Sequence, residues 1–214
     1  MTTMEWIDHD RIIAIVRGLA PEPMVALADA LLRGGVRLVE ITFNQAQPDS
    51  WADTARSIRL IGERFAGRML AGAGTVMTLE QLRLAADAGA RYIISPNVDV
   101  AVIRETRKLG LASLPGALTP TEIAAAHDAG ADAVKVFPAG SLGPDYIRAI
   151  RAPLCHIPLL AVGGVTEKNC AGFVAAGCAG VGVGGNLVNK QWIQDGKFDD
   201  ITALARTYTL ALGR

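Results

Sequence analysis

The chain has too little cysteine and histidine for several classes of protein. Its three cysteines, at positions 155, 170 and 178, are odd in number and include no CxxC pair, so neither a disulfide framework nor a zinc site is indicated. The three histidines fall near the N-terminus, on an expected outer helix and in an expected loop, and we assign none of them to a metal site. We therefore predict that the protein uses no metal and no other cofactor.

Charge of one sign and long apolar runs are also missing. Lys and Arg together number 21, and so do Asp and Glu, which leaves no basic excess to bind nucleic acid or an anionic membrane. No apolar run approaches the roughly 20 residues that span a bilayer. The first residues, MTTMEWIDHDR, carry acids where a signal peptide has a basic flank and an apolar segment. These features predict a cytoplasmic protein.

One pattern recurs along the chain: an Ala- and Leu-rich helix, a glycine, and then an apolar strand. It is present in LADALLRGGVRLVEIT, LRLAADAGARYIISP, TRKLGLASLPG, IAAAHDAGADAVKVFP and FVAAGCAGVGVGG. Each glycine suits the left-handed position that follows a helix C-terminus. Helices that alternate with strands in this way indicate parallel strands joined by crossover helices.

Eight segments have the composition of buried strands. They are residues 12–16, 37–42, 69–74, 91–95, 111–115, 133–137, 158–162 and 179–184. Eight strands with intervening helices predict a (β/α)8 TIM barrel of class α/β, and residues 1–214 show no linker that divides them into two domains. An open doubly wound sheet is the alternative architecture.

A single lysine interrupts the apolar stretch DAVKVFPAG at residues 132–140. Because side chains alternate along a strand, Ala133, Lys135 and Phe137 share one face, and the valines between them suit the helix-covered exterior. Lys135 is then expected inside the barrel near its C-terminal end, where barrel enzymes have their active sites. The same alternation in RLVEIT turns Glu40 inward.

Two interpretations of this pair are open. One is a structural ion pair between two strands, although buried ion pairs often cost more free energy than they return. The other is a nucleophilic amine, because desolvation that lowers the lysine pKa by about three units leaves useful neutral amine near pH 7. Such an amine forms a Schiff base with a carbonyl, and a carboxyl with a raised pKa can move the protons. We favour Lys135 as nucleophile and Glu40 as proton shuttle.

Glycine-rich loops follow the last two predicted strands, in AVGGVTEKN and VGVGGNLVNK. In barrels these two loops commonly bind a phosphate through backbone N–H groups. The alternative is that the glycines serve only tight turns. The candidate phosphate-binding residues are Gly163, Gly164, Gly184, Gly185 and Asn186.

Further polar residues and prolines fall at strand ends, where a substrate would lie. Arg17 suits a substrate carboxylate or phosphate, because a guanidinium binds both in a bidentate manner. The remaining lysines, at 108, 168, 190 and 197, are expected on the solvated surface. The other candidate binding residues at strand ends are Asn44, Thr75, Pro96 and Pro115.

Seven motifs appear in order along residues 8–210: VRG, VEITFN, GAGTV, SPN, PGALTPTE, KVFPAG and AVGGV. Together they resemble the class I aldolases that act on 2-keto-3-deoxy-6-phospho sugar acids and 4-hydroxy-2-oxoglutarate. The resemblance implies a Schiff-base lysine at Lys135, a proton-transferring Glu40, and substrate contacts at Arg17, Thr75 and the glycine loops. It also implies a homotrimer and a phosphorylated 2-keto-3-deoxy sugar acid as substrate.

Two positions bear on the subtype within this family. Gluconate-type members have an arginine where this chain has Asn44, and usually a serine where it has Asn186. Galactonate-type members resemble the EITFN, PNV, LGPDYIRAI and GGVTEKN segments more closely. The galactonate substrate is therefore expected, with the gluconate and 4-hydroxy-2-oxoglutarate activities as the alternative.

Phe137 and Pro115 would wall the pyruvyl group. A phosphosugar isomerase without a covalent lysine and a phosphosugar-binding sensor are the other readings.

Overall fold

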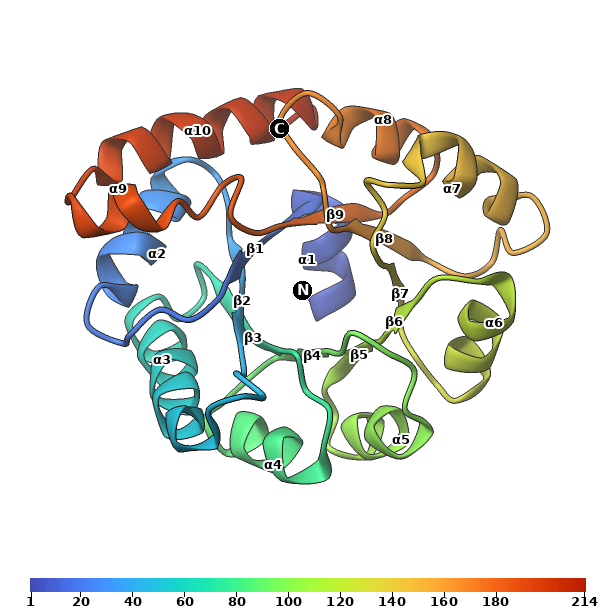
Figure 1. The fold of residues 1–214 in the computed structure, drawn as a ribbon, viewed down its shortest axis with the longest axis horizontal. Helices are drawn as coiled ribbons and strands as arrows, with labels where there is room; N and C mark the ends of the chain where they lie inside the picture. The colour runs from blue at the N-terminus through green and yellow to red at the C-terminus, as the bar shows by residue number, and fades with distance from the viewer.

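The computed structural model describes residues 1–214 as a ring of parallel strands enclosed by helices (Figure 1). The strands are β1 (Ile12–Val16), β2 (Leu38–Thr42), β3 (Leu70–Gly74), β4 (Tyr92–Ile94), β5 (Ala112–Leu114), β6 (Gly116–Ala117), β7 (Val134–Val136), β8 (Leu159–Val162) and β9 (Gly180–Val183). The helices are α1 (Thr3–Asp10), α2 (Met24–Arg33), η1 (Pro48–Ser50), α3 (Trp51–Arg64), α4 (Leu79–Asp87), α5 (Val100–Lys108), α6 (Pro120–Asp128), α7 (Gly143–Arg151), α8 (Cys170–Ala175), α9 (Lys190–Gln194) and α10 (Phe198–Ala211). None of these helices has both the length and the apolar character needed to cross a bilayer.

The ring closes through the fifth predicted strand, which Pro115 divides into β5 and β6. The hydrogen-bonded order runs β5-β4-β3-β2-β1-β9-β8-β7-β6, so its two ends are consecutive in the chain. The amide of Asp132 donates to the carbonyl of Ser113 at 2.9 Å, and that of Lys135 donates to Pro115 at 2.8 Å. The predicted barrel is thus confirmed, and the alternative of an open sheet is excluded. The nine strands occupy eight positions around the barrel, because β5 and β6 share one of them.

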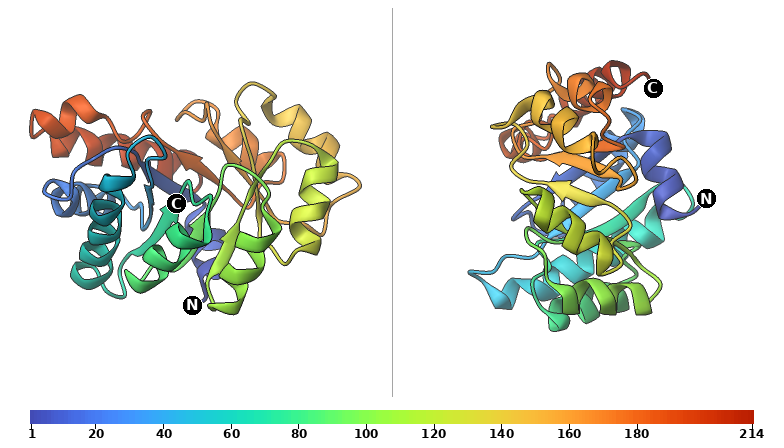
Figure 2. Two further views of the ribbon diagram at one scale, coloured as in Figure 1. Left: turned by 60° about the horizontal axis from the view of Figure 1, so that its bottom comes forward. Right: turned by 90° about the vertical axis from the view of Figure 1, so that its right-hand side faces the viewer.

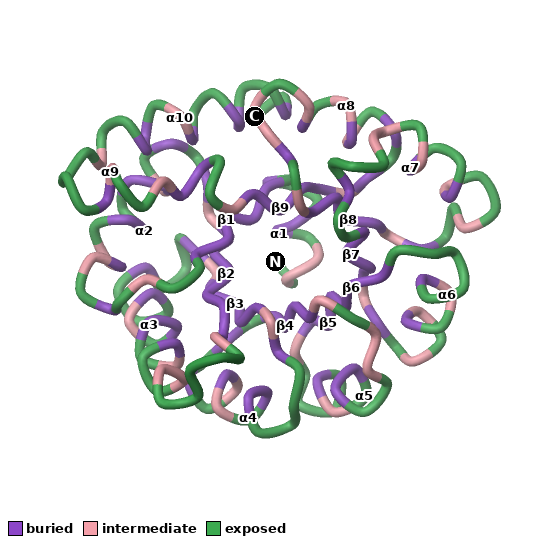
Figure 3. The backbone as a smooth tube through the Cα atoms, viewed as in Figure 1, coloured by how far each residue is buried: buried purple, intermediate pink, exposed green.

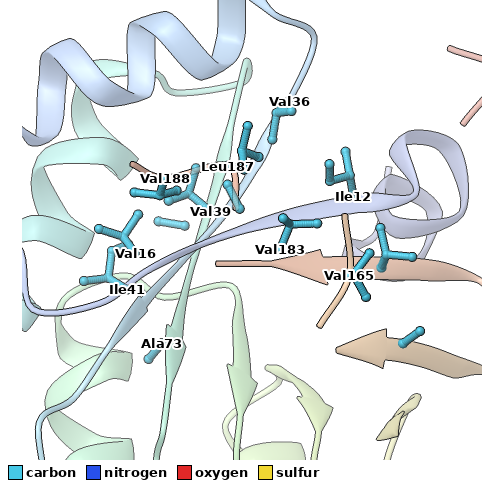
Figure 4. Packing of buried hydrophobic residues seen from close by; sticks show 14 of the residues in the cluster. Ile12, Val16, Val36, Val39, Ile41, Ala73, Val165, Val183, Leu187 and Val188 are labelled. Carbon is cyan, nitrogen blue, oxygen red and sulfur yellow. The ribbon is translucent and has the colours of Figure 1, made fainter. Parts of the chain in front are cut away.

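Two apolar layers hold this ring together, and the alternation of side chains assigns residues to them as predicted. A cluster of 12 buried residues, including Ala133, fills the barrel interior. A cluster of 52, including Val134 and Val136, lies between strands and helices. Figure 4 shows β-branched residues of this outer layer. Figure 3 shows the strands almost entirely buried, while the outer faces of the helices are exposed. The strands therefore read as continuous apolar runs because both faces are covered.

The glycine of each repeat takes the predicted conformation. In all five repeats the second residue after the helix is a glycine with a positive φ, which reaches 106° at Gly130 and Gly177. The backbone amides of this glycine and of the residue after it then cap the helix. For example, the amide of Gly130 donates to the carbonyl of His127, and the amide of Ala131 donates to the carbonyl of Ala126. This fixes the short entry into each following strand.

Helix α1 closes the N-terminal end of the barrel and is seen within the ring in Figure 1 and below it in Figure 2. The sequence analysis did not predict this helix, although Thr2 and Glu5 form a capping box at its start. Its Trp6 and Ile7 belong to the interior cluster. Asp10, which is buried, accepts hydrogen bonds from Arg37 at 2.6 and 3.0 Å. The Arg37 guanidinium also lies 4.5 Å from the centroid of the Trp6 ring.

These contacts predict that Arg37 stabilises the closed end. Arg37→Ala leaves the buried Asp10 carboxylate without its guanidinium, and we expect the free energy of unfolding to fall by about 2 kcal/mol. The measurement is urea unfolding followed by circular dichroism. The matched control is Arg68→Ala, which removes an exposed guanidinium stacked 5.3 Å from the Phe65 ring centroid. Equal losses in the two variants would contradict the assignment.

Candidate active site

A cavity of about 570 Å³ opens at the C-terminal ends of the strands, on the side of β1, β8 and β9. It is closed below by the interior cluster that α1 completes. Nine of the thirteen site residues predicted from the sequence line it: Arg17, Glu40, Lys135, Phe137, Gly163, Gly164, Gly184, Gly185 and Asn186. Segments far apart in the sequence thus meet at one chamber.

Lys135 projects from β7 into this cavity and is 6% exposed. Its backbone is fixed by the hydrogen bond to Pro115, and its ammonium nitrogen lies 4.9 Å from the centroid of the Phe137 ring. Burial lowers the pKa of Lys135, the positive charge of Arg17 lowers it further, and the negative charge of Glu40 opposes the shift. The environment therefore favours the neutral amine more than water does.

Glu40 projects from β2 into the same cavity and is 1% exposed. Its Oε2 is buried and has no hydrogen-bond partner. Burial raises the pKa of Glu40, against the opposing attraction of Lys135 and Arg17. The carboxylate has room only because β3 carries glycine opposite it, since a Cβ on Gly74 would lie 1.8 Å from its Oε1.

No ion pair joins Lys135 and Glu40. The carboxyl keeps an unpartnered oxygen, and burial moves both pKa values toward the uncharged forms. A pair kept for stability would be expected to satisfy its hydrogen bonds, because an unsatisfied buried charge is costly. The geometry favours the chemical interpretation of the two groups over the structural one.

The two glycine loops expose a set of free backbone donors. None of the amides in this set donates a hydrogen bond to a backbone carbonyl, and together they border one part of the cavity. The Asn186 side chain ties the two loops by donating to the carbonyl of Val165 at 2.9 Å. The free amides belong to Gly163, Gly164, Gly184, Gly185 and Asn186. Backbone N–H groups that border a cavity and have no backbone acceptor suit an anionic oxygen cluster.

Four predicted site residues do not line this cavity. The Asn44 side chain is engaged within its own loop, where it donates to Gln47 at 3.0 Å and accepts from Ala46 at 3.0 Å. Pro115 divides the fifth strand, and the neighbouring Gly116 lies so near Pro96 that a Cβ would be 2.5 Å from its carbonyl oxygen. Both prolines therefore lie at the rim formed by β4 and β5.

Thr75, the fourth of these residues, has a φ of 55°. A β-branched residue rarely adopts this left-handed conformation, which costs on the order of 1–2 kcal/mol. Gln45 holds it by donating to the Thr75 carbonyl at 2.7 Å, and the buried Gln81 in turn donates to Gln45 at 3.0 Å. This network between the loops after β2 and β3 was not predicted.

One wall of the cavity was missed by the sequence analysis. Leu19, Val188, Asn189, Lys190, Gln191 and Ile193 also line the cavity. Lys190 is exposed, as predicted, yet a Cβ on Gly18 would lie 3.3 Å from its ammonium nitrogen, so it stands at the cavity mouth beside Arg17. Sequence gives no sign of this meeting, which the return of the chain from β9 past β1 creates.

Fold and site together define a (β/α)8-barrel enzyme with a buried amine, a buried carboxyl and a rim of free backbone amides. A family model described as KDPG and KHG aldolase matches residues 4–204. The chain therefore belongs to the KDPG and KHG aldolase family, and it is a carbon–carbon lyase.

Two curated relatives cover most of the chain. The 2-dehydro-3-deoxy-6-phosphogalactonate aldolase of Escherichia coli (strain K12) is 40% identical over 185 residues, which are 86% of this chain and 87% of the relative. The 2-dehydro-3-deoxy-phosphogluconate aldolase of Treponema pallidum is 33% identical over 96% of this chain and 95% of its own.

Solved structures agree with the fold. A structure described as native KDPGal has a TM-score of 0.83 and 37% identity, over 94% of this chain and 93% of the other. The KDPG aldolase of Legionella pneumophila, with pyruvate captured as a covalent carbinolamine, has a TM-score of 0.86 and 25% identity, over 97% and 98% of the two chains.

The space opposite Glu40 gives a direct prediction. In Gly74→Ala the new methyl group displaces the flexible end of Glu40, so we expect the fold to persist and aldolase turnover to fall by about 100-fold or more. Turnover and the thermal midpoint are measured together. Gly62→Ala is the control, because nothing lies within 4 Å of its added Cβ. Normal turnover in Gly74→Ala would show that the carboxyl position is not critical.

Proposed function

We propose that the protein cleaves 2-dehydro-3-deoxy-6-phosphogalactonate into pyruvate and glyceraldehyde 3-phosphate through a Schiff base on Lys135. The observation that carries this proposal is the unpaired, buried amine that shares a chamber with the buried carboxyl of Glu40. The carbinolamine captured in the Legionella pneumophila enzyme supports the same chemistry.

The reaction begins when the Glu40 carboxylate takes a proton from Lys135, and the neutral amine then adds to the C2 ketone. Glu40 supplies the proton with which the carbinolamine loses water, and an iminium forms. Glu40, as carboxylate, then takes the proton of the C4 hydroxyl, and the electrons of the C3–C4 bond move into the iminium. The aldehyde leaves with its phosphate. Glu40 passes this proton to C3 of the remaining enamine, and water hydrolyses the resulting iminium, which releases pyruvate and returns Lys135 and Glu40 to their starting forms.

The ends of the substrate have separate binding groups. The free amides of the loops after β8 and β9 receive the phosphate, because several N–H groups without backbone acceptors border the cavity there. Arg17 at the rim receives the carboxylate, as a guanidinium binds it in a bidentate manner. Phe137 and Pro115 wall the pyruvyl group, and Thr75, Asn44 and Pro96 complete the rim on the β2–β4 side.

The galactonate substrate is favoured over the gluconate one by two kinds of support. The Escherichia coli galactonate relative is 40% identical and the Treponema pallidum gluconate relative 33%. The Asn44 side chain is also folded onto its own loop, where gluconate-type members have an arginine. The gluconate and 4-hydroxy-2-oxoglutarate activities remain the second candidate.

Assembly and location complete the proposal. We infer a homotrimer from the family likeness alone, and a cytoplasmic location from the composition of the chain.

A borohydride test decides the covalent step. Incubation with pyruvate and reduction with borohydride should add the reduced pyruvyl group to Lys135, because reduction fixes the iminium as a stable amine. Peptide mapping by mass spectrometry locates the adduct. Lys190→Ala, which removes the other lysine at the cavity, should still form it, whereas Lys135→Met should not. Cleavage without an adduct, or an adduct on Lys190, would rule out Lys135 as the nucleophile.

The two phosphorylated C4 epimers decide the substrate. With both assayed side by side at equal concentrations, we expect kcat/KM for the galactonate epimer to exceed that for the gluconate epimer by about 10-fold, a difference of roughly 1.4 kcal/mol in transition-state binding. A preference for the gluconate epimer would place the protein with the gluconate-type members while leaving the Schiff base untouched.

A further inference from the structure

Two buried polar atoms inside the barrel have no hydrogen-bond partner. One is Oε2 of Glu40 on β2, and the other is the hydroxyl oxygen of Tyr92 on β4. Tyr92 is fully buried and packs in the interior cluster. An unsatisfied buried group costs about 1–3 kcal/mol, and phenylalanine would fill the same space without that cost. Packing alone therefore does not explain why this position has a hydroxyl group.

Strand β3, which lies between β2 and β4, brings the two side chains together. Its register sets Gly72 directly opposite Glu40, and the ring of Tyr92 lies over this same glycine. A Cβ on Gly72 would be 2.2 Å from the ring edge and 2.5 Å from Cζ, the carbon that bears the hydroxyl. The next inward residue, Gly74, faces the Glu40 carboxyl. Two successive glycines thus cradle phenol and carboxyl, one above the other.

The chemistry of the two groups is complementary. Burial raises the pKa of Tyr92, and the negative charge of Glu40 raises it further, so the phenol keeps its proton and is a hydrogen-bond donor. A carboxylate is an acceptor only. The charged groups that face Glu40 from other elements are Lys135 on β7 and Arg17 after β1, and β3 contributes only its glycines. Tyr92 thus supplies an uncharged donor near the carboxyl.

We propose that Tyr92 is a positioning residue whose hydroxyl donates a hydrogen bond, through one buried water, to Oε2 of Glu40. A bridging water would give both atoms the partner they lack, because the two groups make no direct hydrogen bond with each other. The proposal rests on the proton-transfer role proposed for Glu40. Tyr92 does not touch the substrate; it acts by holding the carboxyl and by stabilising its charged form.

The consequence is a defined pH dependence. A hydrogen bond to the carboxylate favours the charged form, so the loss of the donor raises the pKa of Glu40. The acid limb of the kcat/KM profile, which reports ionisation of Glu40 in the free enzyme, then moves to higher pH. In Tyr92→Phe we expect a shift of about one pH unit and, on that limb, a loss of about tenfold in kcat/KM.

Tyr208→Phe is the matched control. Tyr208 on α10 is also fully buried and its hydroxyl also lacks a partner, but it lies in the outer layer away from Glu40. Both substitutions remove one oxygen from a buried phenol, so the control measures any general effect on packing. The wild-type limb in Tyr208→Phe and the shifted limb in Tyr92→Phe support the proposal. An unshifted or acid-shifted limb in Tyr92→Phe, or equal shifts in both variants, overturns it.

A second measurement keeps Tyr92 intact. With all three tyrosines labelled with ¹³C at Cζ, one signal should titrate at the pH of the acid limb, and this titration should vanish in Glu40→Gln. Three flat signals, or a titration that persists in Glu40→Gln, overturn the link. Activity separates the two hypotheses: Glu40→Gln should cut turnover by about 100-fold. Near-normal turnover in Glu40→Gln would refute the shuttle role of Glu40. The link between Tyr92 and Glu40 would still stand if the tyrosine signal titrates in the wild type and is flat in this variant.

Discussion

The structure depends on holding an amine and a carboxyl out of water without letting them neutralise each other in an ion pair. Burial of either group is unfavourable, and it moves the pKa of Lys135 down and that of Glu40 up. The fold tolerates this because two apolar layers, of 52 and 12 buried residues, enclose the ring on both faces. Stability gained from those layers sustains a site that is itself destabilising, as is common where reactivity requires strain.

Room for the reactive groups comes from side chains that are missing. Gly72 and Gly74 leave one inner face of β3 bare, and larger side chains from the two neighbouring strands fill it. At the rim, the glycines after β8 and β9 leave their amides free. Glycine weakens a strand, since it has no side chain to pack. Glycine at these positions therefore marks where the barrel loses side-chain packing but provides space for the reactive groups.

Much of this could be predicted from the sequence, because alternation along a strand fixes which side chains face inward. It placed Lys135 and Glu40 within the ring, and the recurring glycines gave the helix-to-strand connections. It could not predict contacts between distant segments, such as Lys190 beside Gly18 or Tyr92 over Gly72. Helix α1 has a capping box that a search for such signals would have found. The break at Pro115 follows from a missing amide, which alternation does not reveal.

Because α1 closes the N-terminal end of the barrel, the active-site cavity opens at the C-terminal end. Trp6 and Ile7 seal one end within the interior cluster, and the cavity opens only among the loops at the other. Whatever is bound deepest must then depart last. In the proposed reaction, the fragment attached to Lys135 lies behind the one that carries the phosphate, so the phosphorylated fragment must leave first. For the proposed reaction, the closed end of the barrel therefore sets the order in which the two products are released.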